Sequence, residues 1–184
     1  AAMTAPDVEQ HAVPDAGAMR LLQDRARAVP VGVRLDRGRA RALEVKIEQS
    51  RAALRGERYD DAERAARRAL EVDARSAPAA VALADVLLEQ SRLAEAAVVA
   101  ARAVELDPSS PSAHRVLGWS QVRGRQIALA IASSRRALAL NPSPEEAALA
   151  QIGLGDAYLL ENRYDAAIEA YTKATGYGEW DLVP

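Results

Sequence analysis

Apolar residues recur at spacings of three and four along most of the chain, which is the pattern of amphipathic helices. From Leu43 onward these helical stretches come in pairs, because turn residues or prolines interrupt them at regular intervals. The pattern therefore predicts an all-α fold. The expected helices cover residues 43–55, 79–90, 93–105, 127–140, 145–161 and 165–175, with one more beginning at Asp60 and one between Pro111 and Gly124.

Local signals indicate where some of these helices begin and end. Gly56 is expected to end the first helix by adopting the left-handed conformation that helix C-termini favour. Asp60 is expected to cap the next helix, with Glu63 three residues later. The run from Ser143 to Glu146 is a small insertion with the signature of a capping box.

The first forty residues carry a weaker version of the pattern. Residues 15–28 are expected to form a helix capped by Asp15, which Pro30 then ends. An arginine run follows, and we interpret it as the solvated face of a second helical stretch; a docking site for an acidic partner is the alternative. The run consists of Arg34, Arg37, Arg39 and Arg41.

The helix pairs repeat about every 34 residues, which indicates a solenoid in which each pair buries its apolar face against the next. Gly118 and Gly155 lie at the same position within the first helix of a pair, and we expect close helix contacts there because a mid-helix glycine otherwise costs ~1 kcal/mol. Alanines recur on the second helix at two positions seven residues apart: Ala62, Ala69, Ala96, Ala103, Ala130, Ala137, Ala167 and Ala174.

At these positions the sequence resembles the tetratricopeptide repeat family, with about four repeats. The fourth repeat carries the family pattern best, through Leu154, Gly155, Tyr158, Tyr164, Ala167, Tyr171 and Ala174. The first repeat is degenerate, since Gln49 and Ser50 stand at its Leu-Gly position. The resemblance implies a right-handed α-solenoid of antiparallel helix pairs, whose concave groove is lined by the first helix (helix A) of each repeat.

The predicted organisation follows from this register. We expect a flexible tail at residues 1–14, followed by an N-terminal helix and linker at 15–42 that is a candidate cap. The four repeats are expected at residues 43–76, 77–110, 111–144 and 145–175. Residues 176–184 are then a tail or the start of a truncated further repeat.

Composition narrows the classes of partner. The net charge of −2 over 184 residues argues against bulk attraction to nucleic acid. No apolar run approaches the ~20 residues that span a bilayer, so we expect no direct membrane insertion. No signal peptide is visible, and both the bacterial cytoplasm and the periplasm stay open as locations.

The sequence offers little catalytic chemistry. There is no Cys, and His11 and His114 are the only histidines, too few for a multi-histidine metal site. Gly118 and Gly155 fall inside predicted helices rather than in a phosphate-binding loop. We therefore expect a non-catalytic protein without a cofactor or a metal.

Binding would then depend on the groove. Arg115, Trp119 and Arg123 are four residues apart and therefore lie on one face of a helix. Trp and Arg are enriched at binding hot spots. The alternative is that Trp119 packs against the neighbouring helix while the arginines are solvated. The candidate partner-binding residues are Arg51, Arg55, Asp85, Glu89, Arg115, Trp119, Arg123 and Asp156.

The leading hypothesis is a scaffold that binds a peptide or protein segment, within a bacterial multiprotein assembly. Two alternatives stay open. One is self-assembly into a homo-oligomer through open solenoid ends. The other is a regulatory domain of a larger enzyme.

Overall fold

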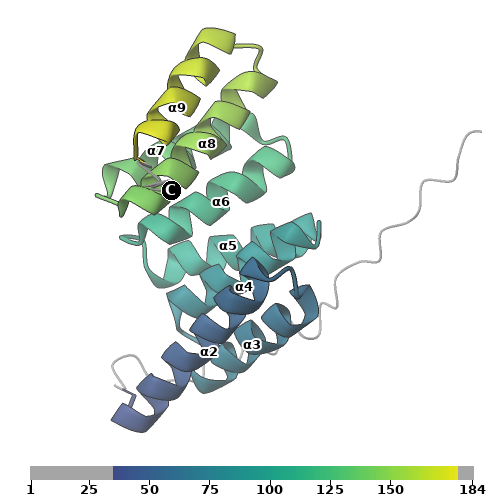
Figure 1. The fold of residues 1–184 in the computed structure, drawn as a ribbon, viewed down its shortest axis with the longest axis vertical. Helices are drawn as coiled ribbons and strands as arrows, with labels where there is room; N and C mark the ends of the chain where they lie inside the picture. The colour runs from purple at the N-terminus through teal and green to yellow at the C-terminus, as the bar shows by residue number, and fades with distance from the viewer. Residues whose placement is uncertain (1–34, 178–184) are drawn as a thin grey trace, which may run out of the picture.

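The computed structural model describes residues 35–177 of the chain. Within this range all secondary structure is helical, and eight helices stack in sequence order along the long axis (Figure 1). The predicted elements at 1–34 and 178–184 lie outside the described residues. The helices are α2 (Arg37–Arg55), α3 (Tyr59–Val72), α4 (Ala77–Glu89), α5 (Leu93–Leu106), α6 (Pro111–Arg123), α7 (Ile127–Ala139), α8 (Pro144–Leu160) and α9 (Tyr164–Tyr177).

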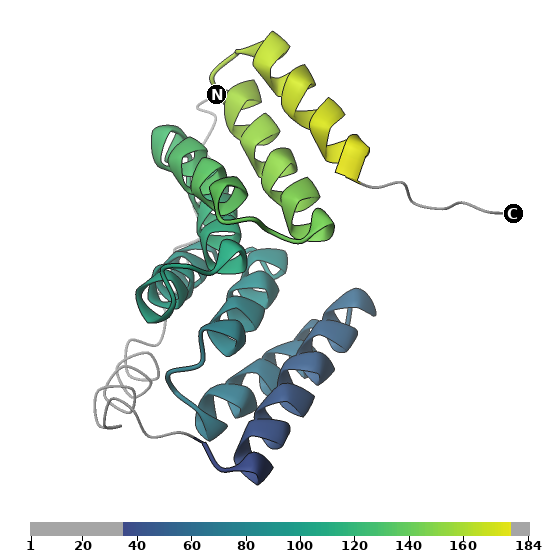
Figure 2. The same cartoon turned by 90° about the vertical axis from the view of Figure 1, so that its left-hand side faces the viewer.

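The helices form antiparallel pairs that stack in two layers. Each pair packs closely on itself: α2 on α3, α4 on α5, α6 on α7, and α8 on α9. The helices A (α2, α4, α6 and α8) also pack on one another in order, while each helix B (α3, α5 and α7) packs on the helix A of the next pair. Figure 2 shows the resulting curved stack, with the first pair in blue at the bottom and the last pair in yellow at the top. The prediction of an all-α solenoid is confirmed.

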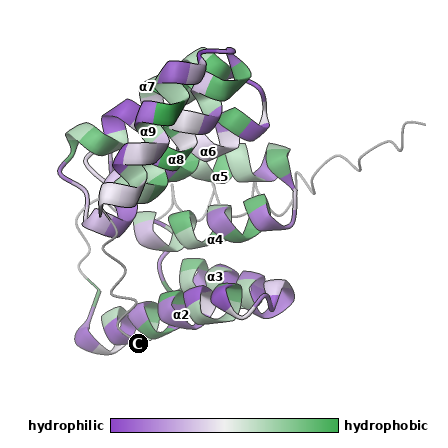
Figure 3. Ribbon diagram, turned by 45° about the horizontal axis from the view of Figure 1, so that its top comes forward, coloured by the Kyte–Doolittle hydropathy of each residue, from purple (hydrophilic) through white to green (hydrophobic). Residues whose placement is uncertain are grey.

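Small side chains build most of the core. The repeated alanines of the second helices are buried, and several have no exposed surface. In the middle of the stack, α4 is buried on nearly all sides and contributes Leu83, Leu87 and Leu88. The end helix α2 has one buried side only and mixes hydrophilic with hydrophobic positions along its length (Figure 3).

The mid-helix glycines mark close approaches between helices, as the repeat pattern predicts. A Cβ added at Gly118 would lie 2.8 Å from the Ser134 hydroxyl oxygen on α7. A Cβ added at Gly155 would lie 2.6 Å from the ring of Tyr171 on α9. Since real Cβ atoms do not approach so closely, both helix pairs depend on the absence of a side chain at these positions.

The first helix begins earlier than its apolar pattern predicts. α2 starts at Arg37 rather than near residue 43, because the Asp36 side chain caps it by accepting a hydrogen bond of 2.8 Å from the Arg39 backbone N–H. Arg37, Arg39 and Arg41 are exposed on its first turns. The Arg39 guanidinium donates to the Val72 carbonyl at 2.7 Å and so ties this turn to the end of α3.

Two turn predictions are wrong by a residue or more. The left-handed residue after α2 is Glu57 (φ 55°), while Gly56 has a φ of −92°. Ser91, Arg125 and Asn162 have positive φ values at the equivalent turns, so the repeat imposes this geometry on non-glycine residues. Asp60 is not the cap of α3 either: Arg58 occupies that position without a side-chain cap bond, and Asp60 lies in the first turn, where the helix dipole favours a carboxylate.

Candidate binding groove

The four helices A line a hollow of about 550 Å³. Its volume falls in the range of small ligand pockets, which suits one or a few side chains of a bound segment. We refer to it as the groove. It is lined by Glu48, Arg51, Leu54 and Arg55 of α2, Val81 and Asp85 of α4, Ser112 and Arg115 of α6, and Ser143, Glu145, Glu146 and Leu149 at the start of α8.

The floor of the groove holds a buried ion pair. Arg115 is only 8% exposed, and its guanidinium donates to both Asp85 carboxylate oxygens at 3.0 and 2.8 Å. Burial by itself lowers the pKa of Arg115, but the charge of Asp85 and hydrogen bonding to it outweigh burial and raise that pKa. Arg115 is therefore charged, and its bidentate contact with the Asp85 carboxylate largely compensates that charge.

The α2 wall of the groove is basic. Arg51 is exposed and forms an ion pair of 2.8 Å with Glu48 one turn earlier. Arg55 is exposed at the last position of α2, and it forms no ion pair or hydrogen bond with residues 35–177. This wall therefore presents at least one cation that is available to a ligand.

The opposite wall is the acidic N-terminus of α8. Ser143 and Glu146 form the capping box that the insertion predicts, and Glu146 also accepts a hydrogen bond from the Ser112 hydroxyl. Partial burial raises the pKa of Glu146, but its bonds to Ser112 and Ser143 outweigh burial and hold the pKa below its ordinary value. Glu145 is exposed and has no ion-pair partner within the described part of the chain.

Three apolar side chains also line the groove: Leu54 on α2, Val81 on α4 and Leu149 on α8. The groove thus combines a basic wall, an acidic wall, a neutralised floor and a small apolar surface. Such a surface can bind a polar peptide segment by charge complementarity and limited apolar burial.

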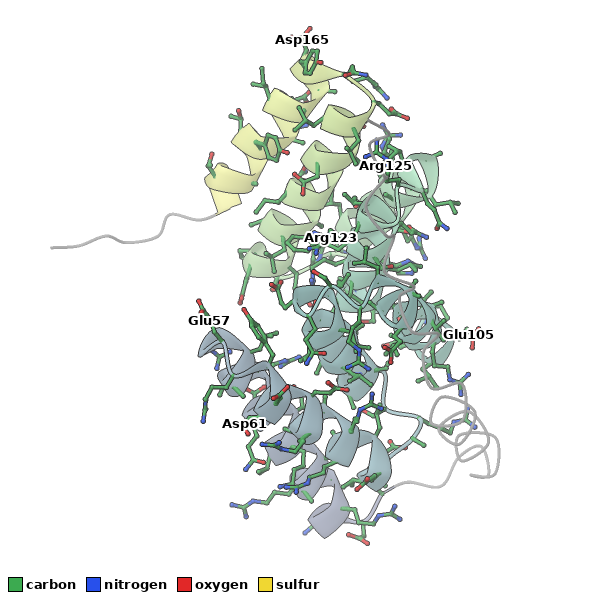
Figure 4. The ribbon with its side chains drawn as sticks, turned by 90° about the vertical axis from the view of Figure 1, so that its right-hand side faces the viewer. Glu57, Asp61, Glu105, Arg123, Arg125 and Asp165 are labelled. Carbon is green, nitrogen blue, oxygen red and sulfur yellow. The ribbon has the colours of Figure 1, made fainter. Side chains whose placement is uncertain are left out.

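The groove contains half of the predicted binding residues, namely Arg51, Arg55, Asp85 and Arg115. Glu89 ends α4 as an exposed residue outside the lining. Arg123, on the last turn of α6, donates to the Ser91 hydroxyl at 3.2 Å (Figure 4). Asp156 accepts a hydrogen bond of 2.5 Å from the Tyr171 hydroxyl, which holds α9 on α8.

Trp119 packs between α6 and α8. Its indole Nε1–H donates to the Leu149 carbonyl at 3.2 Å. A Cβ added at Gly153 would lie 2.7 Å from the indole ring, so the ring fills the space that this glycine leaves free. The described contacts of Trp119 are those of a residue that fixes one helix A against the next.

Sequence reasoning missed the acidic wall, although a signal for it was present. α8 has 17 residues, whereas α4 and α6 have 13 each. The extra turn comes from the insertion that begins at Ser143, and it carries Glu145 and Glu146 to the groove. Treating the insertion as an extension of a groove-lining helix identifies these residues.

Metal-ligand groups and membrane-spanning helices are both absent from the described residues. Between residues 35 and 177, no group of three or more His, Cys, Asp or Glu side chains is arranged to hold a metal ion. None of the helices in that range is both long and apolar enough to cross a bilayer.

The sequence matches the tetratricopeptide repeat family model in two segments, residues 47–111 and 115–179. No protein among the curated sequences matches the chain.

Solved structures share this architecture. A thermophilic tetratricopeptide repeat protein of Thermus thermophilus aligns with a TM-score of 0.66 and 21% identity, over 90% of this chain and 84% of that one. YrrB, described as having an unusual peptide-binding site, aligns with a TM-score of 0.57 and 18% identity, over 76% and 71% of the two chains. A mutant of the Thermobaculum terrenum O-GlcNAc transferase aligns with a TM-score of 0.61 and 29% identity, over 68% of this chain but only 23% of the transferase.

Proposed function

Since the chain belongs to the tetratricopeptide repeat family, we propose that it is a non-catalytic scaffold that binds a protein or peptide segment in its groove, as part of a bacterial multiprotein assembly. The bound segment lies across the four helices A. No chemical step is assigned to the domain, because its surface recognises a partner and does not transform it.

The arrangement of charges in the groove is the observation that carries this proposal. Arg55 on α2 forms no ion pair or hydrogen bond with the described residues, and it lines the same hollow as Glu145 on α8, which forms no ion pair but interacts electrostatically with Arg115. The segment that fits best carries an acidic residue toward α2 and a basic residue toward α8, with a small apolar residue over Val81. The peptide-binding description of the structural neighbour YrrB is consistent with this use of the fold.

The experiment is affinity capture from the source cell, followed by titration of the identified partner. Arg51→Ala combined with Arg55→Ala should weaken binding about tenfold or more, because it removes the basic wall. Arg64→Ala with Arg68→Ala is the matched control: it removes two exposed arginines on α3 that lie outside the groove and should leave the affinity within about twofold. Equal affinities for the groove variant and the unchanged protein would overturn the proposal.

A second candidate is a regulatory domain of a larger enzyme. It is favoured by the 29% identity to an O-GlcNAc transferase, of which the matched region is only 23%. The complete open reading frame tests it directly. A catalytic domain encoded in frame with this domain would support it, and an open reading frame without one would dismiss it.

A further inference from the structure

The third helix pair, α6 and α7, carries arginines without any carboxylate. Between Asp107 and Glu145 the sequence has five arginines and no Asp or Glu. One of them, Arg115, is the buried partner of Asp85 in the floor of the groove. The other four are exposed, and none of them lines the groove: Arg123, Arg125, Arg135 and Arg136. The pair therefore presents a basic surface that is separate from the groove.

These four arginines form no ion pair within the described part of the chain. Arg123 donates to the Ser91 hydroxyl at 3.2 Å, and Arg135 donates to the Tyr158 hydroxyl at 2.7 Å, so both acceptors are neutral. The other two form neither a hydrogen bond nor an ion pair with any residue between 35 and 177. All four charges are therefore available to an anionic ligand.

The repeat register shows that α7 lacks an acid which its neighbour α5 has. Arg136 corresponds to Arg102 on α5, one repeat of 34 residues earlier. Arg102 forms an ion pair of 2.9 Å with Glu105, three residues later on the same helix. At the position of that carboxylate α7 has Ala139, which is exposed. The pairing that neutralises the cation on α5 is therefore missing on α7.

The same comparison holds for α9 and for a second position. Lys173 on α9 corresponds to Arg136 and forms an ion pair of 2.6 Å with Glu169, whereas α7 has Ala132 at the position of that acid. Leu129 on α7 stands where α5 has Glu95, and it is 56% exposed. The third pair therefore replaces surface acids with apolar residues while it keeps the surface cations.

The exposed residues of α7 share one side of the helix, because they recur at spacings of three and four. They are Ala128, Leu129, Ala132, Arg135, Arg136 and Ala139. We refer to these residues, together with Arg123 and Arg125 at the preceding turn, as the α7 face. It combines four arginines with one large apolar side chain.

We infer that the α7 face binds a short acidic segment of a partner protein, with two groups of carboxylates and an apolar residue between them. A guanidinium can bind a carboxylate through two parallel hydrogen bonds, which favours carboxylates as its partners. Arg125 and Arg136 are about 16 Å apart along α7 at ~1.5 Å per residue. An extended segment covers that distance in about five residues, and its apolar residue would lie over Leu129.

The acids of the neighbouring pairs favour a short ligand over a long polyanion. In Figure 4, Arg125 lies along the stack between Asp165 at the top and Glu105 farther down. A nucleic acid or an anionic membrane would meet these acids as well as the α7 face, whereas a short segment is screened from charges beyond about 8 Å. The α7 face also has no aromatic ring on which a base could stack.

The test uses a synthetic acidic peptide as the probe. A fluorescein-labelled peptide of about ten residues, with two glutamates near each end and a leucine in the middle, is titrated with the full chain and followed by fluorescence anisotropy. We expect saturable binding at low ionic strength. Arg125→Glu with Arg136→Glu should weaken it about tenfold or more, because attraction becomes repulsion. Absence of binding to the unchanged chain would overturn the inference.

Ala139→Glu tests the register argument without removing an arginine. It gives α7 the carboxylate that α5 has in Glu105, so Arg136 should pair with it instead of with the probe. We expect the probe affinity to fall about threefold or more. Ala42→Glu on α2 is the matched control, because it adds the same charge at an exposed position away from the α7 face and should leave the affinity within about twofold. Equal affinities for the two variants would overturn the inference.

Arg37→Glu with Arg41→Glu controls for the net charge. Both arginines are exposed on α2 and form no ion pair or hydrogen bond with the described residues, so this variant should leave the probe affinity within about twofold. Arg51→Ala with Arg55→Ala should also have no effect, which separates this site from the groove and from the proposed function. A loss with either control equal to that of the α7 variant would overturn the inference.

Two further measurements test other occupants of the α7 face. A fluorescein-labelled single-stranded RNA of similar length should bind more weakly than the peptide at the same ionic strength. Tighter binding of RNA, abolished by Arg125→Glu with Arg136→Glu, would overturn the inference in favour of a nucleic acid. Sedimentation should give the same mass for the unchanged chain and this variant. A dimer that the variant converts to a monomer would identify a second copy as the occupant and would also overturn it.

Discussion

Arg115 and Asp85 show how one pair of residues can lie at a binding surface and in the core at once. Arg115 lines the groove, but its guanidinium is buried and both donor contacts go to Asp85. The desolvation of a buried charge is compensated only while its partner is present. The pair therefore stabilises the fold whether or not a ligand is bound.

Removing one residue of the Asp85–Arg115 pair should lower the free energy of unfolding more than replacing both residues. We expect Asp85→Ala to lower the free energy of unfolding by about 3 kcal/mol, because it leaves the buried Arg115 cation unpaired. The double variant Asp85→Ala with Arg115→Met should recover most of that loss, since Met replaces the charge with an apolar side chain of similar length. Urea unfolding at neutral pH measures both.

Glu105→Ala is the control for this prediction. It removes an exposed ion pair with Arg102 on α5 and should cost less than about 0.5 kcal/mol. An Asp85→Ala effect as small as that of the control would show that the buried pair does not stabilise the fold.

At the scale of the helices, an ion-pair network joins the first pair to the second. Glu63 on α3 accepts from Arg92, at the start of α5, at 2.8 Å and from Arg67 at 2.7 Å. Burial raises the pKa of Glu63, but the hydrogen bonds from Arg92, Arg67 and Gln90 outweigh burial and lower it below 4.5. Since α3 and α5 belong to different pairs, the network adds a polar contact to an apolar interface.

This network should make stability depend on pH. The folded state holds Glu63 with a pKa below its ordinary 4.5, so it binds fewer protons than the unfolded state in the acidic range. The stabilisation is present above pH 4.5 and is lost as the pH falls through the lower, folded pKa. In Glu63→Gln the loss of stability between about pH 6 and pH 3 should be smaller by up to about 1 kcal/mol.

Chemical denaturation at a series of pH values measures this difference. Glu44→Gln is the matched control, because Glu44 is exposed and has no hydrogen-bond or ion-pair partner among the described residues. If the Glu63 and Glu44 variants have the same pH dependence, the network does not contribute to acid sensitivity.

At the scale of the whole molecule, each pair is stabilised by its neighbours in the stack. α4 packs on α2, α3, α5 and α6, whereas the contacts of α9 within the described chain are concentrated on α8. In such an array, local stability depends on the number of neighbouring interfaces. The middle pairs should therefore open together, and the last helix should open more often.

Hydrogen exchange can measure this gradient. We expect the backbone amides of α9 to exchange at least about tenfold faster than those of α4 under native conditions. Ile168→Glu should leave the exchange of α4 unchanged, since Ile168 is exposed and far along the stack. Equal protection of all helices would instead indicate that the chain unfolds as one cooperative unit.

The groove shows which binding residues a sequence pattern can identify and which it cannot. Arg51 and Arg55 line it because their position on a helix A follows directly from the repeat register. The same register also selects Trp119 and Asp156, but these side chains meet Gly153 and Tyr171 and hold helices together. A register states which side of a helix a residue occupies, and it does not state whether the space there is already filled.

The sequence alone determined the helix pairs and their order, because amphipathic spacing and small residues at recurring positions are local and can be counted along the chain. The tertiary structure alone decided which charges remain available to a ligand. Arg115 is neutralised by Asp85, thirty residues earlier, while Arg55 forms no ion pair or hydrogen bond with the described residues although it lines the same hollow. Burial and pairing depend on side chains from other repeats, and their distances are set only when the helices pack.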